Sequence, residues 1–485
     1  MNDIVLKFHI TKDKQPALIQ SMQHENVEHT HIHSNYFDND NYDLSQQDVS
    51  LKQQCTHHMW MQTLYLPTAH QLLCTQFQMP LDSTQPKKID VKQYQSHKKI
   101  NPIAKNQLKE LLRALKIQFE ADYTRYSSMF KINKTKIRVL VDVGFFKIDE
   151  QHHEFTEIQF KLRQGHVKDF IQFILPRIQR YDLWLDGRNK AQICYSLAQH
   201  HRVQVQTQFR LHKESNTAHA VQDMLNNTLE HLLPNSAAIA SGAFNDEHVH
   251  QARVAIRRIR SVLKTFAAWS KHIDPTWEAQ FAHIFRQLGT QRDLDMIQNS
   301  ILPQLEYVNA PPIHLPMVDA SSNDQLSQVF QSYAFNALIL SVLQFIYTPA
   351  QKKTKTDLKH QFKRDIQKLY HQMIRDAHYF SDYSIDERHT TRKRLKRLCY
   401  SIECITSIYP EAQVKQYLKI LKPAQETLGI YNDLLVAEEV LTPFAVDQPN
   451  MLFTLGWLKA RQNELVYDAN KQLRHLAQTQ PFWSS

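Results

Sequence analysis

The hydrophobic period of the chain changes once along its length, and this change most limits what the chain can fold into. In the first 210 or so residues, short stretches alternate apolar and polar side chains, whereas from about Asn216 apolar positions recur at helical spacing. A period of two is typical of strands with one polar face, and a period of 3.6 is typical of amphipathic helices. The 485 residues are therefore expected to form an α+β protein, in which a strand-rich part precedes an all-α part.

Alternating patterns predict several strands in the first part. They lie at residues 3–10, 137–146, 157–162 and 203–211. Residues 23–58, by contrast, are rich in His, Asn, Asp and Gln and poor in aliphatic side chains, which predicts a polar insertion or long loop. His29, His31 and His33 would share one face if this segment were a strand. A metal site and a plain polar loop therefore both stay open for the insertion.

Composition excludes several classes of protein. The chain has 7 glycines and neither a Walker-type loop nor a GxGxxG motif, which argues against the common nucleotide-binding classes. Its 5 cysteines show no CxxC spacing and its first residues lack a signal-peptide pattern, so we expect a reducing cytoplasm as its location. The most apolar run, residues 334–347, is too short to span a bilayer and predicts a buried helix, with no membrane as partner.

Residues 249–260, VHQARVAIRRIR, place four arginines and a histidine in one predicted helix without any acid. On such a helix a set of basic side chains falls within an arc of roughly 80°, and apolar side chains fall on the opposite side. The basic set is His250, Arg253, Arg257, Arg260 and Lys264, and the apolar set is Ala255, Ile259, Val262, Leu263 and Phe266. One face is therefore expected to be core and the other a ladder of cations.

A second segment, residues 388–400 with the sequence RHTTRKRLKRLCY, repeats this pattern. It aligns His389, Arg392, Lys396 and Arg397 with His250, Arg253, Arg257 and Arg258. QLGTQRDLD from Gln287 and TLGIYNDLL from Thr427 align at nearly the same offset, about 140 residues. Two motifs with one offset predict two similar helical bundles related by pseudo-symmetry.

Helices of like charge are self-repelling, which leaves two interpretations open. A phosphate-type polyanion would relieve the repulsion, and arginine offers paired donors for phosphate oxygens. Alternatively the charges form a solvated face or pair with acids elsewhere, for which Asp293, Asp295, Glu403 and Asp433 are candidates. The stripes lack aromatic residues apart from Tyr400, so a bare phosphate chain fits better than nucleic acid.

These paired motifs resemble the CHAD domain, the conserved histidine α-helical domain, over residues 216–485. The resemblance implies two four-helix bundles, with repeat halves at about 216–320 and 325–485, and a basic groove that binds inorganic polyphosphate. Carried over by position, its ligands would be His250, Arg253, Arg257, Arg258 and Arg260 with His389, Arg392, Lys396 and Arg397. Cys399 stands where the family usually has arginine, which is expected to weaken that end of the groove.

Residues 1–212 resemble a divergent CYTH domain, a triphosphate tunnel metalloenzyme with an antiparallel β-barrel. IVLKF stands at the place of the ExExK strand, VDVGFF and TEIQFKLRQG resemble two further strands, and NKAQICYSL resembles the late strand that contains a lysine. The resemblance implies that Lys7, Arg138 and Lys190 contact phosphate and that Asp142 and Glu157 hold Mg²⁺ or Mn²⁺ if the barrel is active.

The departures from that family weaken the metal site. The ExExK positions read Asp3, Val5 and Lys7, and Gln159 and Lys161 replace acids after Glu157. Two divalent ions would be short of carboxylate ligands. A degenerate barrel that binds anions or acts as a scaffold and a residual Mg²⁺-dependent triphosphatase both remain possible outcomes.

The sequence thus predicts a cytoplasmic protein that binds inorganic polyphosphate or triphosphate through its helical domain. Active inorganic triphosphatase is the first alternative, and nucleic-acid binding, which we do not expect, is the second. Association with polyphosphate granules and the oligomeric state are left open by the sequence.

Overall fold

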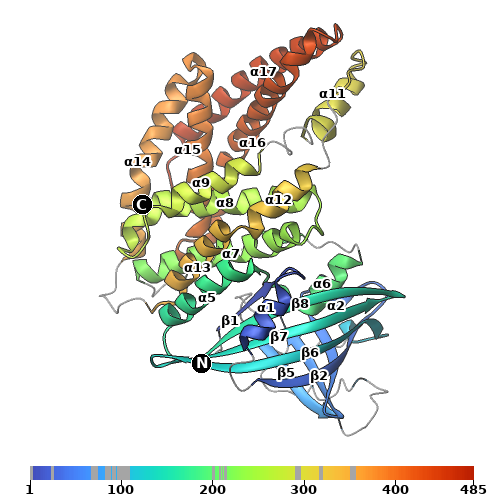
Figure 1. Ribbon diagram of the computed structural model, residues 1–485. Helices are drawn as coiled ribbons and strands as arrows, with labels where there is room; N and C mark the ends of the chain where they lie inside the picture. Colours follow the sequence, from blue (N-terminus) through green and yellow to red (C-terminus); the bar gives the residue numbers. More distant parts are fainter. Residues whose placement is uncertain are drawn as a thin grey trace. The chain divides into compact units, whose positions relative to one another are not determined.

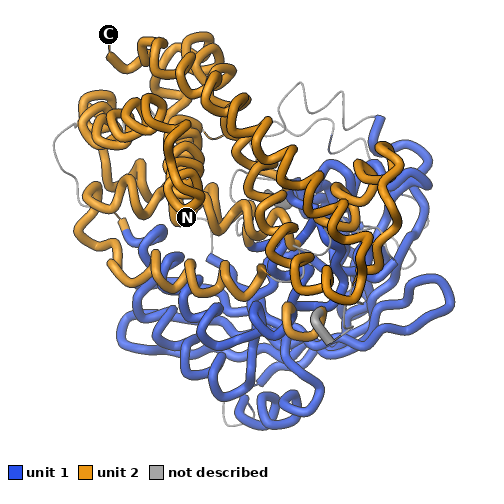
Figure 2. Tube along the Cα trace, turned by 90° about the horizontal axis from the view of Figure 1, so that it is seen from above, with its two compact units in different colours: residues 1–204, 233–248, 327–348 blue, residues 205–232, 249–326, 349–485 orange. Residues whose placement is uncertain are grey.

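The computed structural model describes residues 4–22, 27–66, 75–81, 89, 94, 110–198, 203–206, 209, 211, 216–289, 296–315, 321–349 and 357–484 (Figure 1). The chain divides into two compact units (Figure 2). Unit 1 comprises residues 1–204, 233–248 and 327–348, and unit 2 comprises 205–232, 249–326 and 349–485. The predicted domain boundary at residues 212–216 stays a prediction, since 212–215 lie outside the described residues.

Unit 1 is built on an antiparallel sheet, as the sequence predicts. Its strands are β1 (Ile4–His9), β2 (Glu28–Asp38), β3 (Ser50–Thr56), β4 (Met59–Leu66), β5 (Thr75–Leu81), β6 (Lys116–Ile132), β7 (Thr135–Ile148), β8 (Gln151–Gln164) and β9 (Trp184–Leu185). They follow the order β5-β4-β3-β2-β6-β7-β8-β1-β9. Within the described residues the sheet does not close into the barrel that the resemblance implies, because β5 and β9 remain its two edges.

Both faces of this sheet are covered by helices. On one face Ile32, Tyr36 and Tyr123 pack with the buried side of α6 (Lys190–Leu197). On the opposite face α5 (Val167–Tyr181) contacts β7 and β8, and α1 (Gln15–Met22) contacts α5. Because the side chains of a strand alternate, each strand contributes residues to both faces of the sheet.

Several sequence predictions for the first 212 residues are wrong. The described part of the segment 23–58, residues 27–58, is not a loop, because it forms β2, the short helix α2 (Asp43–Gln46) and β3. Its apolar members Ile32 and Tyr36 are buried while His31 is exposed, so the histidines occupy the other face of a half-buried strand. The described residues 203–206 are likewise not in a strand.

The lysine-containing segment NKAQICYSL is a helix and not the predicted strand. Asn189 caps α6 through a capping box, in which its side chain accepts from the Gln192 backbone and the Gln192 side chain accepts from the Asn189 backbone. Lys190 therefore approaches the sheet from the first turn of a helix.

The rest of the chain is helical, as the sequence predicts. Its helices are α7 (Thr217–Ala240), α8 (Asp246–Phe266), α9 (Trp277–Gln287), α11 (Leu302–Tyr307), α12 (Ser321–Gln331), α13 (Tyr333–Tyr347), α14 (Leu358–Tyr379), α15 (Ile385–Cys404), α16 (Glu411–Leu441) and α17 (Met451–Gln478). In unit 2, α14 contacts α15 and α17, and α16 contacts the same two helices, so these four close into a bundle. Pseudo-symmetry between two bundles stays a prediction.

The apolar run at 334–347 forms α13 and is buried, as predicted. Asn336 is fully buried in unit 1, where its Oδ1 accepts a 2.8 Å hydrogen bond from the Leu185 backbone. Among the helices of the described part, none alone is long and apolar enough to cross a membrane; α12 and α13 meet the length and composition together but are bent by 44°.

Gly144 lies where β7 passes close to β6, and this approach generates a stability prediction. A Cβ there would lie 2.1 Å from the Asp122 carbonyl oxygen and 2.5 Å from the Tyr123 Cα. We expect Gly144→Ala to lower the free energy of unfolding by about 3 kcal/mol, because backbone atoms cannot easily yield. Gly456→Ala in α17, where a Cβ meets nothing within 4 Å, should instead raise it by about 0.5–1 kcal/mol. Denaturant unfolding of both variants checks this, and a wild-type midpoint for Gly144→Ala would contradict it.

Candidate functional sites

The predicted division of α8 into an apolar and a basic side is confirmed by burial. Ala255, Ile259, Val262 and Phe266 are at most 1% exposed. α8 and α15 also lie against each other in unit 2, since the Arg258 Nη2 lies 2.8 Å from the Glu403 Oε2 and the Thr265 and Ser401 hydroxyls are 3.1 Å apart.

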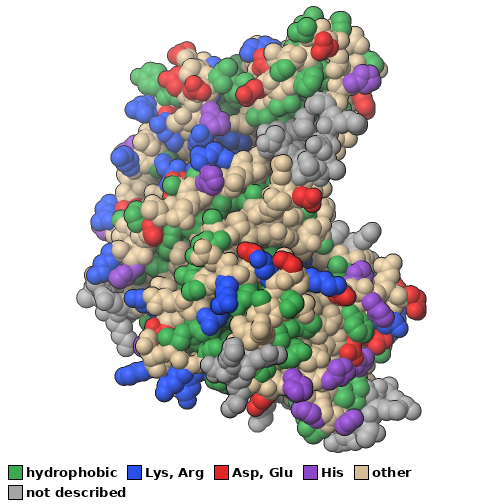
Figure 3. Space-filling view, in the orientation of Figure 1, with side chains coloured by type: hydrophobic (Ala, Val, Ile, Leu, Met, Phe, Trp, Pro, Cys, Tyr) green, Lys and Arg blue, Asp and Glu red, His purple; other side chains and the backbone are tan. Residues whose placement is uncertain are grey.

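The basic sides of these two helices meet. Burial and the nearby charges of Lys264, Arg260 and Arg392 together lower the pKa of Lys393 below its ordinary value. Two of these neighbours lie on α8 and one on α15, so the cations of both helices share one surface. Figure 3 shows Lys and Arg side chains gathered around α15 and the adjoining part of α9. We call this surface the α8–α15 basic surface.

Three predicted ligands on α8 surround an aromatic ring that the sequence analysis missed. The guanidinium carbons of Arg253, Arg257 and Arg260 lie 4.5, 5.3 and 5.9 Å from the ring centre of Phe285 in α9. Arg253 is only 8% exposed, and its Nη1 also donates to the Leu288 carbonyl at the end of α9. The basic stripe of α8 therefore lacks aromatic residues in its own sequence but lies against an aromatic ring of α9.

Salt bridges to acids, the rival interpretation, are realised in part. Glu403, one of the named candidates, pairs with Arg258. Glu278, which was not foreseen, lies 2.8 Å from the Arg260 Nε and 3.2 Å from the Lys264 Nζ. Asp293 and Asp295 lie outside the described residues, and Asp433 lies on α16.

On α15 the predicted ligands are half-buried. His389 Nδ1 lies 2.9 Å from the Asn432 Oδ1, and burial, with the charges of Lys393 and Arg392, lowers the pKa of His389. Arg392, Lys396 and Arg397 lie on the same helix, and His250 is half-buried on α8.

The position of Cys399 on α15 differs from what the resemblance implied, and Arg394 on the same helix is paired with an acid. Cys399 is 1% exposed, so this position belongs to the core and not to the groove wall. Arg394, next to the stripe, is bound by both oxygens of Asp376 at 2.7 Å.

A second cluster lies on the α6 face of the sheet in unit 1. The register sets Asp142 of β7 opposite Glu157 of β8. Four residues away along β7, and on the same face of the sheet, Arg138 lies opposite Lys161. Lys7 of β1 lies opposite Gln159, again on this face. The sheet thus brings together Lys7, Arg138, Asp142 and Glu157, as predicted. Asp3 lies outside the described residues, and Val5 is half-buried on β1.

The two carboxylates of this face are bound by cations. Asp142 Oδ1 accepts from the Arg125 Nε at 2.6 Å, and its Oδ2 accepts from the Arg125 Nη2 at 2.7 Å and from the Lys190 Nζ at 2.8 Å. Glu157 Oε1 accepts from the Lys190 Nζ at 2.7 Å and from the Gln159 amide. Burial opposes ionisation of both acids, but Lys190 outweighs it and keeps their pKa values below the ordinary range.

Three cations of this face were not among the predicted phosphate contacts, and two of them, Lys52 and Arg125, were missed altogether. Arg125 faces Asp142 across the β6–β7 pair, Lys161 lies on β8, and Lys52 lies on β3 with its Nζ 2.7 Å from the Gln54 Oε1. Burial, together with the charge of Arg125, lowers the pKa of both Lys52 and Lys161 to about 8. We call Lys7, Lys52, Arg125, Arg138, Lys161 and Lys190 the basic face of the sheet.

The described residues do not offer the metal site that the CYTH resemblance implies. Within them, no group of three or more His, Cys, Asp or Glu side chains is placed to hold a metal ion. Mg²⁺ needs several oxygen ligands in nearly octahedral geometry, whereas Asp142 and Glu157 already accept from Arg125, Lys190 and Gln159. The donor set therefore does not fit a divalent ion.

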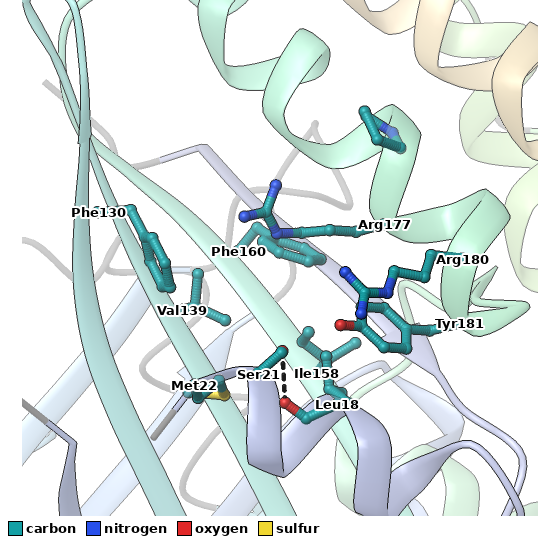
Figure 4. Close-up of a pocket in the computed structure, with 11 residues that line it drawn as sticks. Leu18, Ser21, Met22, Phe130, Val139, Ile158, Phe160, Arg177, Arg180 and Tyr181 are labelled. Carbon is teal, nitrogen blue, oxygen red and sulfur yellow. Dashed lines mark hydrogen bonds between the residues drawn. The ribbon is translucent and has the colours of Figure 1, made fainter. Parts of the chain in front are cut away.

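A cavity of about 260 Å³ lies on the opposite face of the sheet, beside α1 and α5 (Figure 4). Apolar side chains such as Leu18, Met22 and Phe160 form most of its lining. Of its two arginines, Arg177 stacks 3.4 Å from the Phe173 ring centre and donates to the Phe173 carbonyl, and Arg180 lies over Tyr181. These charges are engaged with the protein, so we assign the cavity no ligand.

Comparison with known proteins supports the assignment of the helical part. Residues 223–442 match the model of the CHAD domain, so this part of the chain belongs to the CHAD domain family. The crystal structure of the CHAD domain from the plant Ricinus communis is 24% identical and covers 58% of this chain and 98% of its own, with a TM-score of 0.49. A comparison with curated proteins finds no match.

Two further solved structures are similar at lower identity. A candidate adenylate cyclase from Bacillus halodurans is 16% identical, covers 37% of this chain and 92% of its own, and has a TM-score of 0.26. A candidate adenylyl cyclase from Hippeastrum, described as revealing a dominant triphosphatase activity, is 12% identical, covers 40% and 96%, and has a TM-score of 0.28.

Lys190 generates a stability prediction, because it pairs with two buried carboxylates. We expect Lys190→Met to lower the free energy of unfolding by about 3–5 kcal/mol at neutral pH, since both acids would lose a counter-ion. The loss should shrink as the pH falls below about 4, where the carboxyl groups of the unfolded chain are protonated. Adding Glu157→Gln should restore part of the stability. Denaturant unfolding over a range of pH measures this, and an unchanged midpoint for Lys190→Met would contradict it.

Proposed function

We propose that the chain binds inorganic polyphosphate on the α8–α15 basic surface. The observation that carries the proposal is the meeting of the two basic helices, because the Arg258 Nη2 of α8 lies 2.8 Å from the Glu403 Oε2 of α15 and the Thr265 and Ser401 hydroxyls are 3.1 Å apart. The charges of Lys264 and Arg260 on α8 also lower the pKa of Lys393 on α15. A linear chain of phosphates presents a repeating negative charge. A surface to which two helices contribute Lys and Arg side chains offers hydrogen-bond donors along such a chain.

The balance of charge supports this proposal. α8 and α15 together carry eleven Lys and Arg residues. Four of their five acids, Asp246, Glu247, Asp386 and Glu387, lie in the first helical turns, where they complement the helix dipole. The fifth is Glu403, which pairs with Arg258, and Glu278 and Asp376 of other helices pair with Arg260 and Arg394.

The ion pairs within the surface do not prevent binding of a polyanion. Lys264 is 42% exposed and Glu278 is 27% exposed, and pairs of this kind contribute about 0–1 kcal/mol. A phosphate oxygen can therefore replace the carboxylate at small cost. Arg253, Arg257 and Arg260 are held around Phe285, which reduces the conformational freedom lost on binding.

Membership of the CHAD family and the rarity of aromatic side chains along the basic stripes favour polyphosphate over nucleic acid. Phe285 and Tyr400 are the aromatic exceptions that we find in the described surface, and each already carries a guanidinium over its ring. We infer a cytoplasmic protein whose helical part reads phosphate charge and not base identity.

Charge reversal at two exposed positions tests this function. We expect Lys264→Glu combined with Lys393→Glu to weaken binding of long-chain polyphosphate by at least about tenfold, because one contact is lost on each helix. The dependence of log K on log salt should also become shallower, by roughly 1 to 2. Fluorescence anisotropy at several salt concentrations measures both quantities.

The matched control is Lys471→Glu with Arg474→Glu on α17, which changes the net charge equally at exposed positions of another helix. Equal loss of affinity in both double variants would show that only net charge matters and would contradict the assigned surface. Displacement of polyphosphate by duplex DNA at equal phosphate concentration would favour nucleic acid instead.

A further inference from the structure

The basic face of the sheet in unit 1 combines features that are unexpected for a metal-dependent hydrolase. Six cations, Lys7, Lys52, Arg125, Arg138, Lys161 and Lys190, lie with two carboxylates, Asp142 and Glu157. The cluster thus carries four more positive than negative charges. This is an independent site from the α8–α15 basic surface, which lies in unit 2.

The two carboxylates of the basic face accept hydrogen bonds from its cations. Asp142 is fully buried and both of its oxygens accept from Arg125 or Lys190, while Glu157 is 2% exposed and accepts from Lys190. A divalent ion would have to displace the buried ammonium of Lys190 and the half-buried guanidinium of Arg125 from their partners. Breaking buried ion pairs costs several kcal/mol, so these acids are poor candidates for metal ligands here.

The remaining cations lie close to one another. The register sets Arg138 of β7 directly opposite Lys161 of β8, and Lys7 of β1 opposite Gln159, the next residue of β8 on that face. Arg125 of β6 lies opposite Asp142 of β7 on the same face. Lys52 of β3 is influenced by Arg125 and Lys190, so it joins the same group. Strands in a sheet lie about 4.8 Å apart, and side chains from neighbouring strands on one face can converge on a single small ligand.

Aromatic rings make cation–π contacts with two of these lysines and do not neutralise their charge. The Lys190 Nζ lies 5.0 Å from the Tyr123 ring centre and 5.1 Å from that of Phe155, and Lys52 lies 5.6 Å from that of Tyr65. Such contacts favour a cation but leave its charge in place. The face therefore retains an excess of positive charge that an anion can bind.

We propose that the basic face of the sheet binds a compact condensed phosphate without a divalent metal ion, and that Asp142 and Glu157 act as counter-ions that position Arg125 and Lys190. The fixed cations stand in for the charge that a metal ion would supply. The ligand class is one with several adjacent negative charges, such as free triphosphate or the end of a longer phosphate chain. The face binds this anion and does not hydrolyse it.

Calorimetric titration of inorganic triphosphate into the full chain tests the proposal. The protein carries Lys264→Glu and Lys393→Glu, which suppress binding at the α8–α15 basic surface. We expect binding in excess EDTA, and equal or weaker binding with Mg²⁺, because Mg²⁺ neutralises part of the anion. Binding that requires Mg²⁺ or Mn²⁺, or metal-dependent release of phosphate that Glu157→Gln abolishes, would overturn the proposal and favour a triphosphatase.

Variants separate a binding role from a structural one. Lys52→Gln with Lys161→Gln should lower the affinity for triphosphate by at least tenfold and, because it removes repulsion between cations, should raise the melting temperature of the protein without ligand. Lys147→Gln, on the other side of β7, should leave the affinity unchanged. If the double variant binds like the wild type, or loses binding only because it unfolds at lower temperature, the basic face is not the site.

The source of the phosphate group is distinguished in the same background. Triphosphate and long-chain polyphosphate are titrated at equal molar concentration of molecules. If triphosphate binds more tightly than long-chain polyphosphate, the site takes the free anion. If the two ligands compete at similar concentrations, the site takes the ends of phosphate chains. If neither triphosphate nor long-chain polyphosphate binds, the proposal is overturned. The function proposed for unit 2 does not depend on this result, because it is measured on the protein that retains Lys264 and Lys393.

Discussion

The buried contacts of Lys190 with Asp142 and Glu157 are the interaction on which unit 1 depends most. Lys190 extends from the first turn of α6, and its two partners lie on β7 and β8, so one ammonium group fixes the helix on the sheet. Arg125 completes the set from β6 through two hydrogen bonds to Asp142. Because each charge has a partner, the group can be buried at the centre of the face that carries the other cations.

In unit 2 the acids of the two basic helices are separated from most of the cations. On α8 and α15 the acids stand mostly at the helix starts, and the cations of both helices meet where Lys393 lies among Lys264 and Arg260. Repulsion in the absence of ligand is a stability cost that a polyanion removes. Both units therefore present excess positive charge built on a rigid support, a strand face in one and a helix pair around Phe285 in the other.

The sequence predicts the parts of this structure that depend on local pattern. The α+β division, the apolar side of α8, the buried α13 and the shared face of Lys7, Arg138, Asp142 and Glu157 follow from periodicity or family motifs. It could not predict Glu278 and Phe285, which reach α8 from α9 through tertiary packing. Lys52 and Arg125 were missed because strand register decides which cations meet, and β2 was missed because its outward histidines masked the alternation of Ile32 and Tyr36.

In the site proposed for unit 1, fixed cations of the chain, and not a metal ion, would balance the charge of the phosphate. The most direct measurement is ¹³C NMR titration of the lysine side chains in excess EDTA, with Lys52 and Lys161 assigned through arginine variants. The account predicts pKa values of about 8 for both lysines without ligand, rising towards the ordinary lysine value of about 10.4 when triphosphate is added. Values that do not change until Mg²⁺ is supplied would contradict it.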